Sequence, residues 1–212
     1  MKDGRRFLIT LIRHGEPHIG RGWCSATDFS EWLHTEGDRG IVQSSVATKE
    51  LPPDCLVYCS NLRRAIESAS RLTDFKAVCV DSIFREPGLG PLTAPHWIRL
   101  PTSAWTVVAR IAWFIRVSDG PESVELARRR AKEAAKRLDA DALQHGHVAV
   151  VGHALFNTLI ACELRLLGWK GPKRPGRQFW DQTTYVYEGP GATRLRAFRK
   201  PRLQDLLPLD AA

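Results

Sequence analysis

An arginine and a histidine stand side by side where a short apolar run ends, close to the N-terminus. The run covers residues 7–12, and Arg13, His14 and Gly15 follow it directly. Such a run predicts a buried strand, and open α/β folds bind their ligands at the carboxyl edge of the sheet. Gly15 would let the backbone come close to a ligand, and a cation beside an imidazole suits a phosphoryl group. The alternative is a strand end with solvated polar side chains.

Three further fragments place groups of the same kind after predicted strands. Arg63 and Arg64 follow a second apolar run, Glu86 follows a third, and His153 ends a fourth. Two histidines, an arginine and a carboxylic acid are the groups needed to transfer a phosphoryl group through a covalent phosphohistidine. Because neighbouring side chains on a helix diverge by about 100°, we expect one of the two arginines, and not both, to face the phosphate.

With these fragments in order, the chain resembles the histidine phosphatase superfamily, the phosphoglycerate mutase-like enzymes, over roughly residues 6–165. The motifs that carry the resemblance are R-H-G-E at 13–16, C-S-x-L-x-R-A at 59–65, the acid at 86 and V-V-G-H at 150–153. The stretch 120–123 is also similar to the family's G-E-S helix start, with a proline inserted.

The resemblance implies a phosphomonoester hydrolase that works through a phosphohistidine on His14. In this interpretation Arg13, Arg64 and His153 bind the transferring group, His153 being counted as catalytic as well, and stabilise the charge on its equatorial oxygens. The motif spacing selects Arg64 over its neighbour. The alternative for His153 is a core histidine with satisfied hydrogen bonds.

Glu86 is the expected proton donor to the leaving oxygen, and it would then take a proton from the attacking water. The family's acid usually precedes a stretch with glycine and often tryptophan, which residues 86–90 match only in part. Glu16 could therefore share this task, although it could equally form a salt bridge or cap a turn.

Two departures from the mutase branch favour a phosphatase. Mutases typically carry an asparagine and a later threonine or serine after the first motif, where this chain offers Arg21 and Ser25 as substitutes. The W-E-G element after the acid is also absent. A phosphoglycerate-type mutase stays open as an alternative, as does a module that binds phosphorylated ligands on a degenerate phosphatase scaffold.

No cofactor and no metal are expected. His145 and His147 have H-x-H spacing, but no third ligand stands near them in the sequence, so we assign them to a loop. The expected partner is a phosphorylated small molecule or a phosphoprotein. The substrate stays open among sugar phosphates, nucleotides, phosphoproteins and small metabolites, and the sequence does not indicate an oligomeric state.

Charge and hydropathy narrow the partners further. The net charge is +8, but the basic cluster at 128–137 is interleaved with acids, which favours a solvated helix face over a nucleic-acid site. No apolar run approaches the ~20 residues that cross a bilayer, so no membrane partner is expected. The first apolar run is too short for a signal peptide, and the five cysteines show no C-x-x-C pair. We therefore expect a cytoplasmic protein with reduced thiols.

The resemblance implies one histidine phosphatase-like domain over residues 1–212, with a cap insertion around 87–120. Its fold class is α/β, a three-layer α/β/α sandwich of the phosphoglycerate mutase-like kind with a mainly parallel sheet. Expected strands cover 6–13, 55–59, 76–80, 147–152, 183–188 and 194–199. Expected helices cover 36–47, 61–73, 103–117, 121–144 and 154–167, with Asn61 and Ser123 as possible caps.

Overall fold

A mostly parallel sheet forms the centre of the molecule. The computed structural model describes residues 6–18, 22–35, 38–47, 49–73, 78–117 and 120–188. Within them the central sheet has five strands in the order β4-β3-β6-β1-β7, and β7 runs antiparallel to β1 while the other pairs are parallel. The strands are β1 (Phe7–Arg13), β3 (Leu56–Cys59), β4 (Cys79–Val80), β6 (His147–Gly152) and β7 (Gln182–Tyr187).

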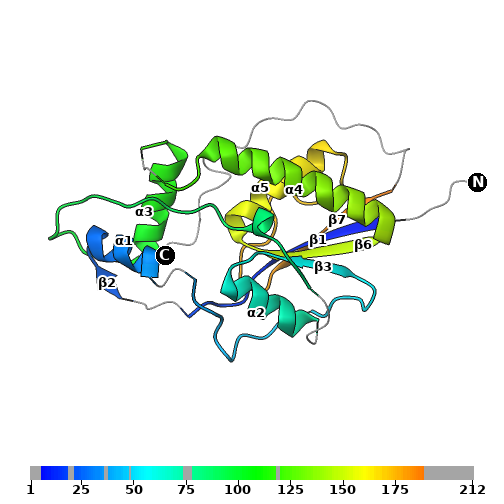
Figure 1. Cartoon of the computed structure of the whole chain (residues 1–212), viewed down its shortest axis with the longest axis horizontal. Helices are drawn as coiled ribbons and strands as arrows, with labels where there is room; N and C mark the ends of the chain where they lie inside the picture. Colours follow the sequence, from blue (N-terminus) through cyan, green and yellow to red (C-terminus); the bar gives the residue numbers. More distant parts are fainter. Residues whose placement is uncertain are drawn as a thin grey trace, which may run out of the picture.

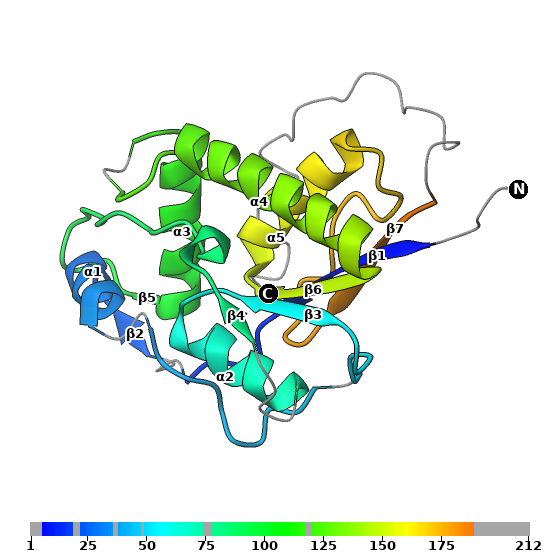
Figure 2. The ribbon, with the colours of Figure 1, turned by 45° about the vertical axis from the view of Figure 1, so that its right-hand side comes forward.

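Helices cover both faces of this sheet, as Figures 1 and 2 show. They are α2 (Arg63–Leu72), α4 (Val124–His145) and α5 (Ala154–Leu166), and a short 3-10 helix, η1 (Ser82–Phe84), follows β4. α4 and α5 lie on one face and α2 lies on the other. Ile9 and Leu11 pack toward the first pair, whereas Ile12 packs toward α2, because successive side chains of a strand point to opposite faces. The predicted three-layer sandwich with a mainly parallel sheet is confirmed.

Local signals explain where the long helix begins and ends. Ser123 caps α4, because its hydroxyl accepts a hydrogen bond from the backbone nitrogen of Leu126 at 3.2 Å. The helix ends at Gly146, whose φ of +85° favours glycine. His145 and His147 flank that turn, and the ring of His147 bonds the Thr10 hydroxyl at 2.9 Å.

The expected cap of α2 is wrong. The helix begins after Leu62, and the backbone nitrogen of Arg63 donates to the carboxylate of Asp38 at 2.7 Å. The Asn61 side-chain oxygen is buried without a hydrogen-bond partner among the described residues. The carboxylate of Asp38, from a distant loop, thus caps the N-terminus of α2, where the sequence analysis had expected Asn61.

The expected helix at 36–47 is also wrong over its described part, residues 38–47. Those residues form a turn and a single bridge between Pro17 and Ile41. Side chains of α2 bind the backbone groups that a helix would pair internally: Glu67 accepts from the Ile41 nitrogen, and Arg71 donates to three carbonyl groups of the loop. The expected strand at 194–199 lies outside the described residues.

A second group of elements lies beyond the carboxyl end of β1, on the left of Figure 1. We call it the outer module: β2 (Trp23–Cys24), α1 (Ala26–Thr35), β5 (Leu100–Pro101) and α3 (Thr102–Phe114). β2 and β5 pair antiparallel, so two distant chain segments build the module. It has its own small core, in which Phe29 and Trp105 are buried.

The tryptophans within residues 87–120, the expected cap insertion, differ in their exposure. Trp105 and Trp113 are buried, and Trp97 is 72% exposed. The expected helix at 103–117 is present as α3. In the described part of the chain, no helix combines the length and the hydrophobicity needed to cross a bilayer.

Candidate active site

Two buried histidines meet at the carboxyl edge of the sheet. Arg13 on β1 pairs with Gly152 on β6, so the residues that follow the two strands become neighbours. Those residues are His14 and His153, whose ring centroids lie 5.0 Å apart. Their exposed fractions are 5% and 2%. The sequence prediction that strand ends bring these two side chains together is matched by their positions.

The ring of His14 is fixed in one orientation. Its Nδ1 lies 2.7 Å from the carbonyl oxygen of Gly15, and because a carbonyl can only accept, Nδ1 must carry a proton. Burial lowers the pKa of His14 well below its ordinary value, and the charges of Arg64 and Arg13 lower it further. The neutral ring therefore keeps the lone pair on Nε2, which is the form that can act as a nucleophile.

His153 is held through its other nitrogen. Its Nε2 lies 2.9 Å from the hydroxyl oxygen of Ser60, and that oxygen accepts a hydrogen bond from the backbone nitrogen of Leu62 at 3.2 Å. Its Nδ1 is buried and has no hydrogen-bond partner among the described residues. Burial and then the charge of Arg64 lower the pKa of His153 well below its ordinary value. A buried ring nitrogen without a partner is a group that a bound ligand could satisfy.

The backbone around His14 is packed too closely for any side chain at position 15. A Cβ on Gly15 would lie 2.5 Å from the indole ring of Trp180 and 2.9 Å from the hydroxyl of Ser45. The Gly15 nitrogen donates to Ser68 at 2.9 Å, and the Trp180 indole nitrogen donates to Ser45 at 2.6 Å. Close packing against Trp180 and Ser45 therefore requires glycine at this position.

Two arginines surround the histidines. Arg13 donates to the backbone carbonyl of Arg177, its guanidinium carbon lies 4.2 Å from the centre of the Phe179 ring, and burial lowers its pKa to about 10. Arg13 therefore stays charged at neutral pH. Arg64 is also buried, with a lowered pKa, and its charge acts on both histidines. Arg63 instead pairs with Glu67 at the surface, so the structure brings Arg64 to the histidines and not its neighbour.

Glu86 lies among these cations with both of its oxygens engaged. One oxygen accepts from Arg110 at 3.0 Å, and the other accepts from the backbone nitrogen of Phe156 at 3.1 Å. Both charged side chains are only 15% exposed. Of the charges that act on Arg13 and Arg64, Glu86 has the largest effect on each.

Arg110 is a site residue that the sequence analysis did not identify. It lies on α3 of the outer module, and its second nitrogen donates to the carbonyl oxygen of Pro87 at 2.7 Å. The sequence does contain a feature that could have identified it, because Arg110 is the single charged residue within the apolar stretch 103–115. A charge in such a stretch needs a buried partner, and Glu86 is that partner.

Two other sequence candidates lie elsewhere. Ser25 exchanges hydrogen bonds with Asp28 at the start of α1, where it caps the helix and does not reach the histidines. Arg21 lies outside the described residues. Among the described residues, no group of three or more His, Cys, Asp or Glu side chains could hold a metal ion.

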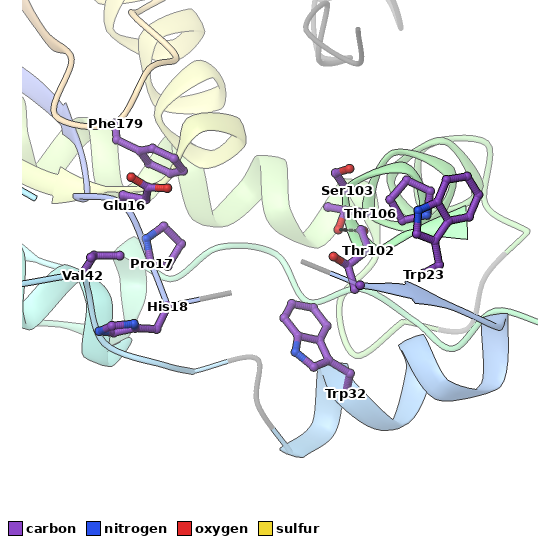
Figure 3. A pocket seen from close by; sticks show the side chains of 12 residues that line it. Glu16, Pro17, His18, Trp23, Trp32, Val42, Thr102, Ser103, Thr106 and Phe179 are labelled. Carbon is purple, nitrogen blue, oxygen red and sulfur yellow. Dashed lines mark hydrogen bonds between the residues drawn. The ribbon is translucent and has the colours of Figure 1, made fainter. Parts of the chain in front are cut away.

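A cavity of about 830 Å³ opens between the histidines' edge of the sheet and the outer module. Glu16 and Phe179 line its near side, and Trp23 and Trp32 line its far side, as Figure 3 shows. Phe179 also packs against the ring of His14, with the ring centroids 5.8 Å apart. The cavity therefore adjoins the cluster of histidines and arginines through Phe179, and the side chains of that cluster are not among its lining residues.

Comparisons with known proteins agree with this architecture. A family model described as histidine phosphatase superfamily (branch 1) matches residues 9–189. Phosphoglycerate mutase from Bacillus anthracis str. Sterne superposes with a TM-score of 0.56 at 17% identity, over 88% of this chain and 90% of that one. A protein named mycobacterial hydrolase 1 superposes with a TM-score of 0.50 at 20% identity, over 86% and 91%. No curated protein sequence matched the chain.

Proposed function

This chain belongs to the histidine phosphatase superfamily, and we propose that it hydrolyses phosphomonoesters through a phosphohistidine on His14. The observation that carries the proposal is the state of this side chain. A buried, neutral imidazole has its Nδ1 bound to a backbone carbonyl and its Nε2 lone pair left over, beside Arg13 and Arg64. Binding a phosphate needs the arginines but no nucleophile. The substrate is a phosphorylated small molecule or a phosphoprotein.

The first half of the reaction moves the phosphoryl group to the protein. The lone pair of His14 Nε2 attacks phosphorus, the N–P bond forms, and the bond from phosphorus to the ester oxygen breaks. The leaving oxygen takes a proton and departs as an alcohol. Arg13, Arg64 and the free Nδ1 of His153 would bind the three equatorial oxygens, where the charge of the transition state is spread.

The second half returns the protein to its starting state. A water oxygen attacks phosphorus, the N–P bond breaks, and its electrons return to His14 Nε2. The water proton passes to a carboxylate, and inorganic phosphate leaves. In a mutase, the hydroxyl group of an acceptor takes the place of this water.

We assign the proton transfers to Glu86. Its charge is the strongest attraction on both site arginines, so a phosphate bound by those arginines would lie near this carboxylate. Its bonds to Arg110 and to the Phe156 nitrogen hold the group in one place. Glu16, which lines the adjoining cavity, is the second candidate. We also propose that the chain works as one domain, with residues 87–120 forming part of a cap over the site.

The test combines turnover with capture of the intermediate. Wild-type protein should hydrolyse nitrophenyl phosphate at the same rate with and without EDTA, and a denaturing quench followed by mass spectrometry should find phosphate on His14. His14→Ala should lose both signals, whereas His96→Ala, at an exposed loop position, should keep both. Arg64→Ala and His153→Ala should each lose about 10²–10³ in rate, since that is the usual effect of one contact to transition-state charge.

Each other outcome identifies a competing function. Near-normal turnover by His14→Ala would overturn the covalent mechanism. A rate that falls with EDTA and returns with a divalent ion would contradict metal-independent chemistry. Transfer of phosphate to an added phosphoglycerate in preference to water would indicate a mutase, and tight binding of phosphorylated ligands without any turnover would indicate a binding module.

The role of Glu86 has its own test. A good leaving group such as nitrophenolate departs without a proton, whereas an alkoxide needs one, and general acid catalysis contributes about 10²–10⁴ in rate. Glu86→Gln should therefore slow an alkyl phosphate far more than nitrophenyl phosphate, measured as kcat when phosphoryl transfer limits both. Equal losses on the two substrates would make Glu86 structural, and Glu16→Gln would then be compared in the same assay.

A further inference from the structure

The cavity between the histidines and the outer module lies beside the proposed nucleophile, with Phe179 between them. Phe179 lines the cavity and packs 5.8 Å from the His14 ring, while Arg13 lies over the Phe179 ring at 4.2 Å. A phosphoryl group bound between Arg13 and His14 would therefore have this cavity beside it. If the proposed reaction is correct, the alcohol part of the bound substrate extends away from the arginines that hold its phosphate. The cavity is the space next to those arginines into which it can extend.

Most of the cavity wall is aromatic, apolar or uncharged, and the exceptions are Glu16 and His18. Phe179, Pro17 and Val42 lie on the side of the sheet, and the indole rings of Trp23 and Trp32 lie opposite them (Figure 3). Polar contacts are offered by hydroxyl groups at the start of α3, which come from Thr102, Ser103 and Thr106. Such walls match a ligand with an apolar body and few polar groups.

The charged residues on the cavity wall also favour a ligand whose alcohol part carries no acidic group. Glu16 is an acidic residue on the cavity wall, and the described lining residues include no lysine or arginine. The buried cations Arg13, Arg64 and Arg110 are instead near Glu86 and the histidines. A carboxylate on the alcohol part would therefore meet no lysine or arginine on the described wall, which is unfavourable in a partly enclosed space.

The far wall is a firm surface. Trp32 stacks on Phe29 with ring centroids 5.8 Å apart and an angle of 25° between the rings, and Phe29 is fully buried in the core of the outer module. Trp23 is 67% exposed, so much of its indole is free to be covered by a ligand. Aromatic side chains held in this way favour flat, apolar ligands through stacking and burial.

We infer that the substrate is the phosphate monoester of a small alcohol with an aromatic or similarly bulky apolar body and no acidic group, bound with that body between Phe179 and the two tryptophans. The volume of about 830 Å³ lies within the range of pockets that enclose small molecules. The inference deepens the proposed phosphatase activity and rests on it.

The experiment compares three primary alkyl phosphates, whose leaving oxygens are alike: 2-(1-naphthyl)ethyl phosphate, glycerol 1-phosphate and 3-phosphoglycerate. We expect kcat/KM to be highest for the naphthyl compound and lowest for the compound with the carboxylate. Trp23→Ala and Trp32→Ala should each lower kcat/KM for the naphthyl compound about tenfold and change it little for glycerol 1-phosphate. Trp97→Ala is the matched control, since Trp97 is exposed and does not line the cavity.

The outcomes separate this inference from the function beneath it. One outcome is turnover of all three compounds with phosphate on His14, but with kcat/KM for 3-phosphoglycerate equal to or higher than that for the naphthyl compound. This outcome overturns the inference and leaves the proposed phosphatase activity standing. Equal losses of kcat/KM on all three compounds in both tryptophan variants would also overturn the inference and leave the proposed activity standing. Absence of turnover and of phosphoprotein with every compound overturns both. Circular dichroism checks folding, and if Trp32→Ala does not fold, the more exposed Trp23 decides the outcome.

Discussion

Lowering the pH from 7.5 to 5.5 should destabilise the fold through its two buried histidines. His14 and His153 are almost fully buried, and burial together with nearby arginines holds both pKa values well below the ordinary 6.5. In the unfolded chain both rings would titrate near pH 6.5. Below that pH the unfolded state binds more protons than the folded state, so the free energy of unfolding falls as the pH falls.

The size of this effect follows from the same linkage. If a ring stays neutral in the folded protein down to pH 5.5, the change from pH 7.5 costs roughly 1–2 kcal/mol for each histidine and about 3 kcal/mol for the pair. His147 adds a smaller loss in the same direction, because burial lowers its pKa as well. The loss begins near pH 6.5 and grows until the pH reaches the folded-state values.

Urea denaturation at pH 7.5, 6.5 and 5.5 measures this loss. A double variant, His14→Gln with His153→Gln, should lose about 3 kcal/mol less stability over that range than wild-type protein. His96→Gln, at an exposed loop position, should lose as much as wild-type protein. Parallel losses in wild-type protein and the double variant would refute the reasoning, because they would mean that the two rings do not resist protonation in the folded state.

Three further substitutions test particular contacts. Arg110→Met should destabilise the protein by about 3–5 kcal/mol, and a double-mutant cycle with Glu86→Gln in urea denaturation should show a favourable coupling energy; additive losses would contradict it. Ser60→Ala removes the hydroxyl that holds the second histidine and should lower kcat/KM about threefold to tenfold without changing stability much; an unchanged kcat/KM would count against that contact. Gly15→Ala forces a methyl group against an indole ring and should cost about 1–3 kcal/mol in urea denaturation, whereas Gly22→Ala, which meets no atom within 4 Å, should not; similar costs for both would remove the steric argument.

The sequence was sufficient to predict the positions of those site residues that directly follow a strand. His14 and His153 directly follow apolar runs, and parallel strands carry their carboxyl ends to one edge, so their meeting needs no knowledge of side-chain packing. Helix geometry predicted that one of Arg63 and Arg64 would face the site, the family motif indicated Arg64, and Arg63 indeed pairs at the surface. The roles proposed for these residues stay predictions.

Contacts between distant segments could not be predicted from the sequence. The partner of Glu86 is Arg110, which stands on a helix that β2 and α1 help to hold, and no local pattern joins the two. The Phe179 ring against His14 comes from a loop near the end of the described chain. Asn61 failed as a cap for the same reason, since Asp38 reaches the helix from another loop. Local propensity cannot rank such candidates when tertiary contacts decide between them.

The strand order has a consequence for how the protein is made. β6 is the last of the parallel strands in the chain, yet it lies between β1 and β3, and these two strands do not pair with each other. A growing chain therefore carries β1 apart from the β3–β4 pair, with strand edges that have no partner, until β6 leaves the ribosome. Unpaired edges of this kind promote aggregation, and pairing across a long loop is slow. Insertion of β6 is also the step that brings His153 to His14, so the sheet centre and the pair of histidines assemble in the same event.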